Sequence, residues 1–293
     1  MNQAVYTPHD HTFVVCAYKQ SEYLRQCIES LVGQTTASRV ILVTSTPNKS
    51  IEKLCGESEI PLYINQGPHH GIAGDWNFGV AQTSTKLVTI ARRDDVYKPS
   101  YTADMLAVLN KAAEKIDEAQ TEGVQHNEPS THKEPLLYFT NYAELRDGHE
   151  ITHNKLLRIK RLMLVPLRVS LFACWRWVRT AILGLGNPIC CPSITLLRTT
   201  LDKLGREEFF DEHFGSNLDW QTWLMIAKLP GAFVYNPTIE MCHRIHEESE
   251  TSRLIQNHAR EDEDFEMLAK FWPRPIARLI NVVYKKGQKS NRS

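Results

Sequence analysis

The chain has 293 residues, 42% of them hydrophobic and 23% charged, which allows a substantial core and argues against disorder throughout. Its formal net charge of zero argues against a nucleic-acid-binding protein. The seven cysteines are an odd number and lack metal-site spacing, which indicates reduced thiols in a cytoplasmic protein. The N-terminal stretch is polar and lacks the apolar core of a signal peptide.

The first hundred residues alternate strand-like and helix-like segments, which is the pattern of β–α units stacked around a mostly parallel sheet. Strands are predicted at 11–18, 39–44, 61–65, 87–91 and 136–145, and again at 232–235 and 239–242. Helices are predicted from Ser21 to Gly33, at 50–55, 71–81 and 101–119, and from Asn217 onward. A polar loop is predicted at 120–135.

Charge is strongly segregated along the chain. Between Ile151 and Leu201 there are eight Lys and Arg residues but no Asp or Glu, and the stretch from Arg274 to Ser293 is again only basic. We expect a main domain at 1–250 that includes a basic helical insertion at about 151–186, and a basic helical extension at 251–293. The insertion is too charged to span a bilayer comfortably.

Two interpretations of the basic insertion remain open. With Phe172, Trp175 and Trp177 it fits an interfacial segment on an anionic membrane surface. It also fits a helical subdomain packed on the core, with Arg stems covering apolar surface.

The clearest candidate for a functional site is the pair Asp94 and Asp95, which follows a buried strand. Ligands bind at this carboxyl edge in open α/β sheets. Adjacent carboxylates repel each other unless a divalent metal or basic side chains join them, and Arg92 and Arg93 directly precede this pair. The alternative is a solvated acidic pair that caps the next element.

Two loops could hold a nucleotide. Ala17 and Tyr18 end the first strand beside a helix, where backbone amides and an aromatic ring suit phosphates and a base. The loop that Gly71 opens allows close backbone approach, and Asp75 and Asn77 can hydrogen-bond sugar hydroxyls or a base. A half-buried aromatic residue and a plain capped turn are the structural alternatives.

Two later motifs could complete a site. Asp219 lies in the first turn of a predicted helix and could act as a general base, although the helix dipole alone also favours an acid there. His243, Arg244 and His246 follow a strand and could supply a metal ligand and a phosphate partner. Satisfied polar residues at a strand end are the simpler explanation of the second motif.

The order and spacing of these motifs resemble family 2 glycosyltransferases of the GT-A fold. The resemblance covers about 11–110 and 187–250, and it rests on FVVCAYKQSEYLRQCIESLVGQT (Phe13 to Thr35), RVILVTSTPN (Arg39 to Asn48), GIAGDWNFGVAQTSTKLVTIARRDDVYKP (Gly71 to Pro99), FDEHFGSNLDWQTWLMIAKLPGAFVY (Phe210 to Tyr235) and HRIHEES (His243 to Ser249). It implies an α/β, Rossmann-like, mixed but mainly parallel sheet flanked by helices.

The resemblance also implies a nucleotide-diphosphate sugar donor and transfer to a hydroxyl with inversion at the anomeric carbon. Asp219 is then similar to the catalytic base. A divalent cation, Mn²⁺ or Mg²⁺, would bind Asp94, Asp95 and His246. The positions similar to the donor site are Ala17, Tyr18, Ser45, Gly71, Asp75, Asn77, Arg92, Arg93 and Asp94.

Three positions depart from the family pattern. Arg92 replaces the first acid of the DxD motif, Thr44 and Ser45 replace an acidic pair that commonly contacts the base, and Trp76 replaces an Arg. A leaving diphosphate can be stabilised by a metal or by fixed cations. Arg92 or Arg93 could therefore take over part of the metal's role, or pair structurally with the acids and leave the site inactive.

We expect an inverting glycosyltransferase of cell-surface glycan synthesis, with a glycan or lipid-linked acceptor. It would be cytoplasmic or peripheral on the inner face of the plasma membrane. A catalytically inactive glycan- or membrane-binding relative is the alternative from another class. A nucleotidyltransferase is the other enzymatic alternative, but the Gly-rich, basic phosphate loop that it needs near the N-terminus is absent from the sequence.

Overall fold

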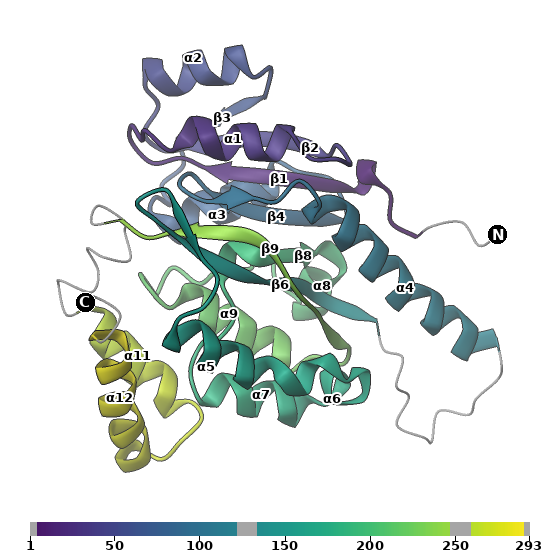
Figure 1. The fold of residues 1–293 in the computed structure, drawn as a ribbon, viewed down its shortest axis with the longest axis vertical. Helices are drawn as coiled ribbons and strands as arrows, with labels where there is room; N and C mark the ends of the chain where they lie inside the picture. Colours follow the sequence, from purple (N-terminus) through teal and green to yellow (C-terminus); the bar gives the residue numbers. More distant parts are fainter. Residues whose placement is uncertain (1–4, 122–133, 247–258, 290–293) are drawn as a thin grey trace.

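The computed structural model describes residues 5–121, 134–246 and 259–289. Its centre is one mixed sheet in the strand order β3-β2-β1-β4-β8-β6-β9-β5, with β7 paired to β6. Helices lie on both sides of this sheet (Figure 1). The predicted α/β, mainly parallel fold is confirmed.

The N-terminal part consists of repeated β–α units. Its parallel strands are β1 (His11–Cys16), β2 (Arg39–Thr44), β3 (Leu62–Ile64) and β4 (Leu87–Arg92). Between them run α1 (Leu24–Val32), α2 (Lys49–Glu57) and α3 (Ile72–Ala81). The predicted segments are all present, with ends shifted by a few residues. Because β1 and β4 are neighbours, Cys16 pairs with Arg92 and their strand ends share one edge of the sheet.

The second half of the sheet adds strands of both directions. β8 (Ile194–Leu197) runs antiparallel between β4 and β6 (Pro135–Arg146). β9 (Ala232–Arg244) lies parallel to β6, and the short β5 (Val96–Tyr97) lies antiparallel to β9. β7 (His149–Ile151) forms a hairpin with β6. The sequence analysis did not predict β5, β7 or β8.

β9 is continuous where two strands were predicted. Pro237 cannot donate to the ladder, and the pairing with β6 shifts register at this point. Asn141 donates from its side chain to the carbonyl of Pro237, and Thr238 N–H donates to the side chain of Asn236. These side-chain hydrogen bonds replace the lost ladder contacts and let the strand pass through the irregularity.

The predicted basic insertion is helical. It contains α5 (Lys155–Leu164), a 3₁₀ turn (Val165–Arg168), α6 (Ser170–Cys174) and α7 (Arg176–Gly184). Arg179 fixes it to the core, because its buried guanidinium donates to the carbonyls of Ala173, Ala227, Leu229 and Gly231. A buried charge is tolerated when its donors are satisfied.

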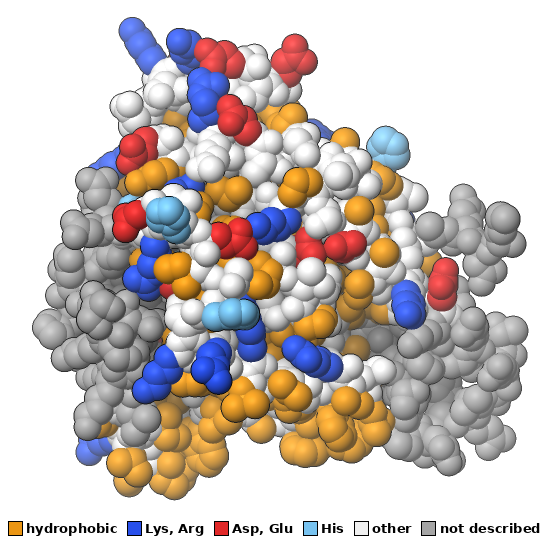
Figure 2. Space-filling model, in the orientation of Figure 1, with side chains coloured by type: hydrophobic (Ala, Val, Ile, Leu, Met, Phe, Trp, Pro, Cys, Tyr) orange, Lys and Arg blue, Asp and Glu red, His pale blue; other side chains and the backbone are white. Residues whose placement is uncertain are grey.

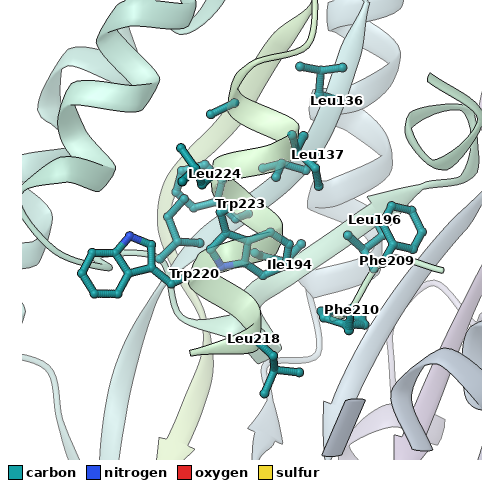
Figure 3. Close-up of a cluster of buried hydrophobic side chains, with 14 of the residues drawn as sticks. Leu136, Leu137, Ile194, Leu196, Phe209, Phe210, Leu218, Trp220, Trp223 and Leu224 are labelled. Atoms are coloured by element: carbon teal, nitrogen blue, oxygen red, sulfur yellow. The ribbon is translucent and has the colours of Figure 1, made fainter. Parts of the chain in front are cut away.

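The core beneath the site lies between α9 (Leu218–Ala227) and the sheet. Trp223 is almost fully buried there, in a cluster with Leu136, Leu137, Ile194, Leu196, Phe209, Phe210, Leu218 and Leu224, whereas Trp220 is buried on another side of α9 (Figure 3). Trp220 donates from its indole N–H to the carbonyl of Leu183 at 3.0 Å, which ties α9 to the insertion.

Two further helices precede α9 in the chain, α4 (Tyr101–Thr121) and α8 (Arg198–Leu204).

The C-terminal helices are α11 (Ala259–Ala269) and α12 (Arg274–Lys289), which pack side by side below the sheet (Figure 1). Most of the predicted 120–135 loop and the boundary at 250/251 lie outside the described residues. Within the described residues, no helix combines the length and apolarity needed to cross a bilayer. The division into domains at 1–250 and 251–293 stays a prediction.

Candidate active site

The acidic pair occupies the turn between β4 and β5. A hydrogen bond from Asp95 N–H to the carbonyl of Arg92 at 3.1 Å closes this turn. Because β5 continues directly into a pairing with β9, in which Val96 is opposite Cys242, the end of β9 is brought against the pair. The strand order therefore explains why residues 94–95 meet residues 243–246.

Asp94 is a buried carboxylate with basic neighbours. Its Oδ2 lies 3.0 Å from Nε2 of His246, and its Oδ1 lies 3.9 Å from Nε of Arg92. Burial alone would raise the pKa of Asp94, but Arg92, His246 and His243 together hold this pKa well below its usual value. Asp94 is thus an anion, and its Oδ1 has no hydrogen-bond partner within the described part of the chain.

Asp95 faces a different partner from Asp94. Its side chain is fully buried, and Oδ1 lies 2.8 Å from Nδ1 of His243 and accepts from the Arg244 N–H at 3.0 Å. The predicted metal set of Asp94, Asp95 and His246 stays a prediction. His243 and the Arg244 backbone hold Asp95 in place, while Asp94 and His246 pair with each other.

Arg244, which the sequence analysis named as a possible phosphate partner, has a structural role at the acidic turn. Its Nε donates to the carbonyl of Asp94 at 2.9 Å, and its Nη2 donates to Oε1 of Gln26 at 2.5 Å. Its guanidinium lies 4.3 Å from the ring centre of Tyr23, a cation–π contact. Arg244 thus joins α1, the acidic turn and β9. Its position at a strand end was the only sequence signal.

A divalent cation fits the residues at this turn. Asp94 Oδ1 is a buried oxygen without a hydrogen-bond partner, and His246 is its neighbour. Mg²⁺ commonly binds through one or two protein groups together with substrate phosphates and water. Within the described residues, no three His, Cys, Asp or Glu side chains gather into a metal site of their own. Asp94 and His246 suit a cation that arrives with a phosphate-bearing ligand.

The loop after β1 reaches the same edge of the sheet. Ala17 is buried and its N–H donates to the carbonyl of Val43, so it holds the loop against β2. Tyr18 is 38% exposed, and the ammonium of Lys19 lies 5.1 Å from its ring centre. Lys19 adopts a left-handed conformation at φ 57° and its N–H donates to Oγ1 of Thr46. This loop therefore carries a partly exposed aromatic ring at the edge where β1 and β4 end.

Ser45 and Asp75 form one hydrogen-bonded unit. Ser45 donates to Oδ2 of Asp75 at 2.8 Å, and Asn65 donates to Oδ1 at 2.9 Å. Partial burial raises the pKa of the Cys16 thiol most, and Asp75 and Arg92 act on this pKa in opposite directions. Both therefore lie close to the end of β1. The hydroxyl at position 45 stabilises Asp75 where an acid would repel it.

Asn77 joins α3 to the segment before α9. It is buried, its Nδ2 donates to the carbonyl of Phe210 at 2.9 Å, and its Oδ1 accepts from the Phe210 N–H at 3.0 Å. Its amide thus fixes this segment against α3, and its contact with the donor stays a prediction.

Gly71 opens α3 in a conformation that suits glycine. Its φ is 95°, and a Cβ at this position would meet no atom within 4 Å. The free N–H groups of a helix N-terminus attract anions. Open space at this point leaves room for a ligand oxygen next to the start of the helix.

Arg93, also predicted to bind the donor, has a buried Nη1 without a hydrogen-bond partner among the described residues. A buried guanidinium nitrogen normally donates. An anionic ligand at this edge would provide the missing acceptor.

Asp219 lies in the first turn of α9 and is held in a fixed orientation. Its Oδ2 accepts from Nδ2 of Asn187 at 2.9 Å, and its Oδ1 accepts from the Trp220 N–H at 2.7 Å. Glu263 of α11 accepts from the N–H groups of residues 215–217 and so caps this end of α9. The hydrogen bonds from Asn187 and from the Trp220 N–H stabilise the ionised carboxylate of Asp219.

Asp219 and the acidic turn border the same short segment. Burial raises the pKa of the Cys191 thiol well above its usual value, Asp219 and Asp95 raise it further, and Arg92 opposes them. Electrostatic effects weaken with distance. Asp219 and Asp95 therefore both lie near the Cys191 thiol.

The arrangement is that of a GT-A glycosyltransferase: a curled, mainly parallel sheet with an acid at its ligand-binding edge. The family model for glycosyl transferase family 2 matches residues 12–165, just over half of the chain. The chain therefore belongs to glycosyl transferase family 2 and carries a glycosyltransferase domain. No curated protein sequence matches it.

Solved structures of S. aureus TarS share this fold. The complex of TarS 1–349 with UDP-GlcNAc has a TM-score of 0.56 and 13% sequence identity, and the match covers 92% of this chain and 70% of that one. A longer TarS structure has a TM-score of 0.51 and 15% identity, with 90% and 43% covered. The chain thus spans less than half of the longer TarS chain, and at these identities the likeness shows the fold alone.

Proposed function

We propose that this chain transfers a sugar from a nucleotide-diphosphate sugar to an acceptor hydroxyl, with inversion at the anomeric carbon. The observation that carries the proposal is the contact of Asp94 with His246 and Arg92, together with the influence of Arg92, Asp95 and Asp219 on the pKa of the Cys191 thiol. The TarS structures with UDP-GlcNAc and with UDP support a nucleotide-sugar donor for this fold.

In the proposed reaction Asp219 is the general base. It accepts the proton of the acceptor hydroxyl while the hydroxyl oxygen forms a bond to the anomeric carbon. Asn187 donates to Oδ2 and keeps the carboxylate oriented. Attack from the side opposite the diphosphate breaks the bond from the anomeric carbon to the phosphate oxygen and inverts the configuration.

The leaving diphosphate carries away the bonding electrons as negative charge. Arg92 is placed to stabilise this charge, since its guanidinium lies next to Asp94. Arg93, whose Nη1 needs an acceptor, is a second cation for the diphosphate. A divalent cation held by Asp94 and His246 would neutralise phosphate charge when bound. Tyr18 would stack on the base, and the N-terminus of α3 at Gly71 would receive donor oxygens.

The first experiment is a thermal-shift series with nucleoside diphosphates and nucleotide sugars, each with Mn²⁺, with Mg²⁺ and with EDTA. A ligand that binds only the folded state raises the melting temperature, so one nucleotide class should stabilise the chain selectively. If no nucleotide stabilises it under any metal condition, the donor assignment is wrong.

The second experiment compares Asp219→Asn with Asp202→Asn, an exposed acid in α8. Loss of a general base typically lowers the rate by about 10²–10⁴-fold. We expect such a loss of sugar transfer for Asp219→Asn, with donor-induced stabilisation retained, and no change for Asp202→Asn. Full transfer activity in Asp219→Asn would contradict the assigned base. If the natural chain binds a nucleotide sugar but transfers no sugar, the protein is a catalytically inactive relative.

The acceptor we propose is a hydroxyl of a glycan or of a lipid-linked saccharide in cell-surface glycan synthesis. The support for a lipid-linked form is the basic, aromatic insertion α5–α7 beside the site. Lys160 and Arg161 of α5 hydrogen-bond Tyr142, whose ring lies 6.3 Å from that of His243. Transfer assays with soluble and detergent-dispersed saccharide acceptors would distinguish the two forms.

A further inference from the structure

Helix α5 and the turn after it have an exposed apolar side as well as a buried one. Leu157, Leu164 and Leu167 face the core, as expected for an amphipathic helix on a protein surface. The other side carries a second apolar row: Ile159, Leu162, Val165 and Val169 are all exposed, and Leu162 reaches 72%. A large exposed apolar row next to a buried one is unusual for a soluble surface.

Helix α7 repeats this arrangement. Val178 and Ile182 are buried, whereas Trp177 is 67% exposed and Leu185, two turns further on, is also exposed. The Trp177 ring stacks on Trp175 at 5.6 Å. Tryptophan side chains of this kind are enriched where protein meets the headgroup level of a membrane.

Helix α12 carries a third exposed row. Ile276, Leu279 and Val282 recur at three-residue spacing, all are exposed, and Leu279 reaches 68%. Ala277 is fully buried on the opposite side. The apolar side of α12 is thus turned away from the protein.

The three rows belong to neighbouring helices on one side of the molecule. Phe271, in the turn before α12, packs on Gly184 of α7, and Trp272 donates to the carbonyl of Gly184 at 2.7 Å. Figure 2 shows hydrophobic side chains gathered along the lower edge of the molecule, where α5–α7 and α12 lie in Figure 1, with Lys and Arg side chains directly above them. We name these exposed residues of α5, α7 and α12 the apolar face.

The charged residues of the helices that carry the apolar face have one sign. Residues 151–201 contain no Asp or Glu, and α12 contains only basic charged residues. Exposed basic side chains next to the apolar rows are Lys155, Arg158, Arg168, Arg176, Arg274 and Arg278. A basic border around apolar and Trp side chains is complementary to an anionic lipid surface, where the apolar groups enter the headgroup boundary and the cations meet phosphates.

We propose that the apolar face binds the surface of an anionic lipid bilayer, with α5, α7 and α12 lying in the interface. Three rows on separate helices act together, so the whole domain is held in one orientation. This inference is independent of the proposed reaction, because it concerns membrane binding alone.

Vesicle flotation tests the proposal with the full chain. Neutral phosphatidylcholine vesicles are compared with vesicles containing about one third phosphatidylglycerol, at low and high salt. We expect flotation with the anionic vesicles and at least tenfold less with the neutral ones. High salt should weaken the binding because it screens the basic border. Equal flotation with both vesicle types, or none with either, would overturn the proposal.

The apolar contribution is tested by Leu162→Gln, Trp177→Gln and Leu279→Gln combined. All three side chains are exposed, so the fold should be retained, which circular dichroism and the melting temperature will show. We expect at least a tenfold loss of flotation. Val32→Gln, which changes a 51% exposed residue of α1, is the matched control and should float like the natural chain. Unchanged flotation of the triple variant would refute the assigned face.

The basic contribution is tested by Lys155→Gln, Arg158→Gln and Arg176→Gln combined, with Lys49→Gln and Lys111→Gln combined as the control. Only the first variant should lose its preference for anionic vesicles. A second copy of the chain is the competing occupant. If a second copy covers the apolar face, light scattering without lipid will show a dimer that the triple apolar variant does not form. This result would also overturn the proposal.

Discussion

The buried histidine that begins β1 predicts a specific dependence of stability on pH. His11 is fully buried, and its two ring nitrogens lie 2.9 Å from the hydroxyls of Ser38 and Thr89. Burial lowers the pKa of His11 from 6.5 to about 3. A neutral imidazole offers one donor and one acceptor, which these two hydroxyls can match.

The sign of the effect follows from which state takes up the proton. Below pH 6.5 the unfolded chain protonates His11, whereas the folded chain resists protonation until the pH approaches about 3. The contribution of neutral His11 to the free energy of unfolding is therefore complete above pH 6.5, and it is lost as the pH falls from 6.5 towards about 3. One pKa unit corresponds to about 1.4 kcal/mol, so about 2 kcal/mol should be lost between pH 7 and pH 5.

The assay is urea unfolding of the natural chain and of His11→Gln, followed by tryptophan fluorescence at several pH values. Every other titrating group is common to both proteins and cancels in the difference. The natural chain should lose about 2 kcal/mol more than the variant between pH 7 and pH 5, while the two curves run parallel above pH 7. Curves that stay parallel down to pH 5 would refute the reasoning, because His11 would then titrate alike in both states.

Four further substitutions are expected to act in defined ways. Arg92→Ala should lower the rate of donor cleavage and make this rate more dependent on Mn²⁺, because a fixed cation next to Asp94 is lost. Initial rates with Mn²⁺ and with EDTA measure both effects, and an unchanged rate would contradict the prediction. Arg179→Met should destabilise the fold by about 3 kcal/mol, since buried carbonyls lose their donors; a urea midpoint within error of the natural chain would exclude that role. Gly74→Ala should weaken donor-induced stabilisation in the thermal-shift assay, because its Cβ would lie 2.5 Å from the carbonyl oxygen of His69 and displace the loop before α3. Glu263→Gln should lower kcat more than KM, since the negative cap on α9 is weakened. Equal effects on kcat and KM would indicate a purely structural role for Glu263.

The β–α repeat was predictable because each of its elements has its own periodic pattern. β1, β2, β4 and α3 are buried runs that local turns separate, and they appear close to their predicted positions. β5 has only two residues, and its existence depends on β9, which lies far away in the sequence. A strand that a distant partner creates has no local signal.

The site was predictable in its acids and less so in their pairing. Asp94 and Asp219 were identified from their positions at a strand end and in a first helical turn. The sequence alone could not show that Asp95 turns to His243 while Asp94 turns to His246, since that depends on the register between β5 and β9. Asn77 was assigned to the donor from its helix, but its partner Phe210 is supplied by a segment about 130 residues later.

The β5–β9 pairing also determines when the site can form. It brings together the acidic turn and residues 243–246, whose hydrogen bonds join positions 148 to 152 residues apart. Contacts of such long sequence separation form late, because a large loop must close first. During synthesis Asp94 and Asp95 therefore emerge long before His243, Arg244 and His246, and they stay hydrated until β9 inserts beside β6. Nucleotide binding would then report completion of the whole sheet, and a fragment ending at residue 165 would have the acids without the residues that hold them.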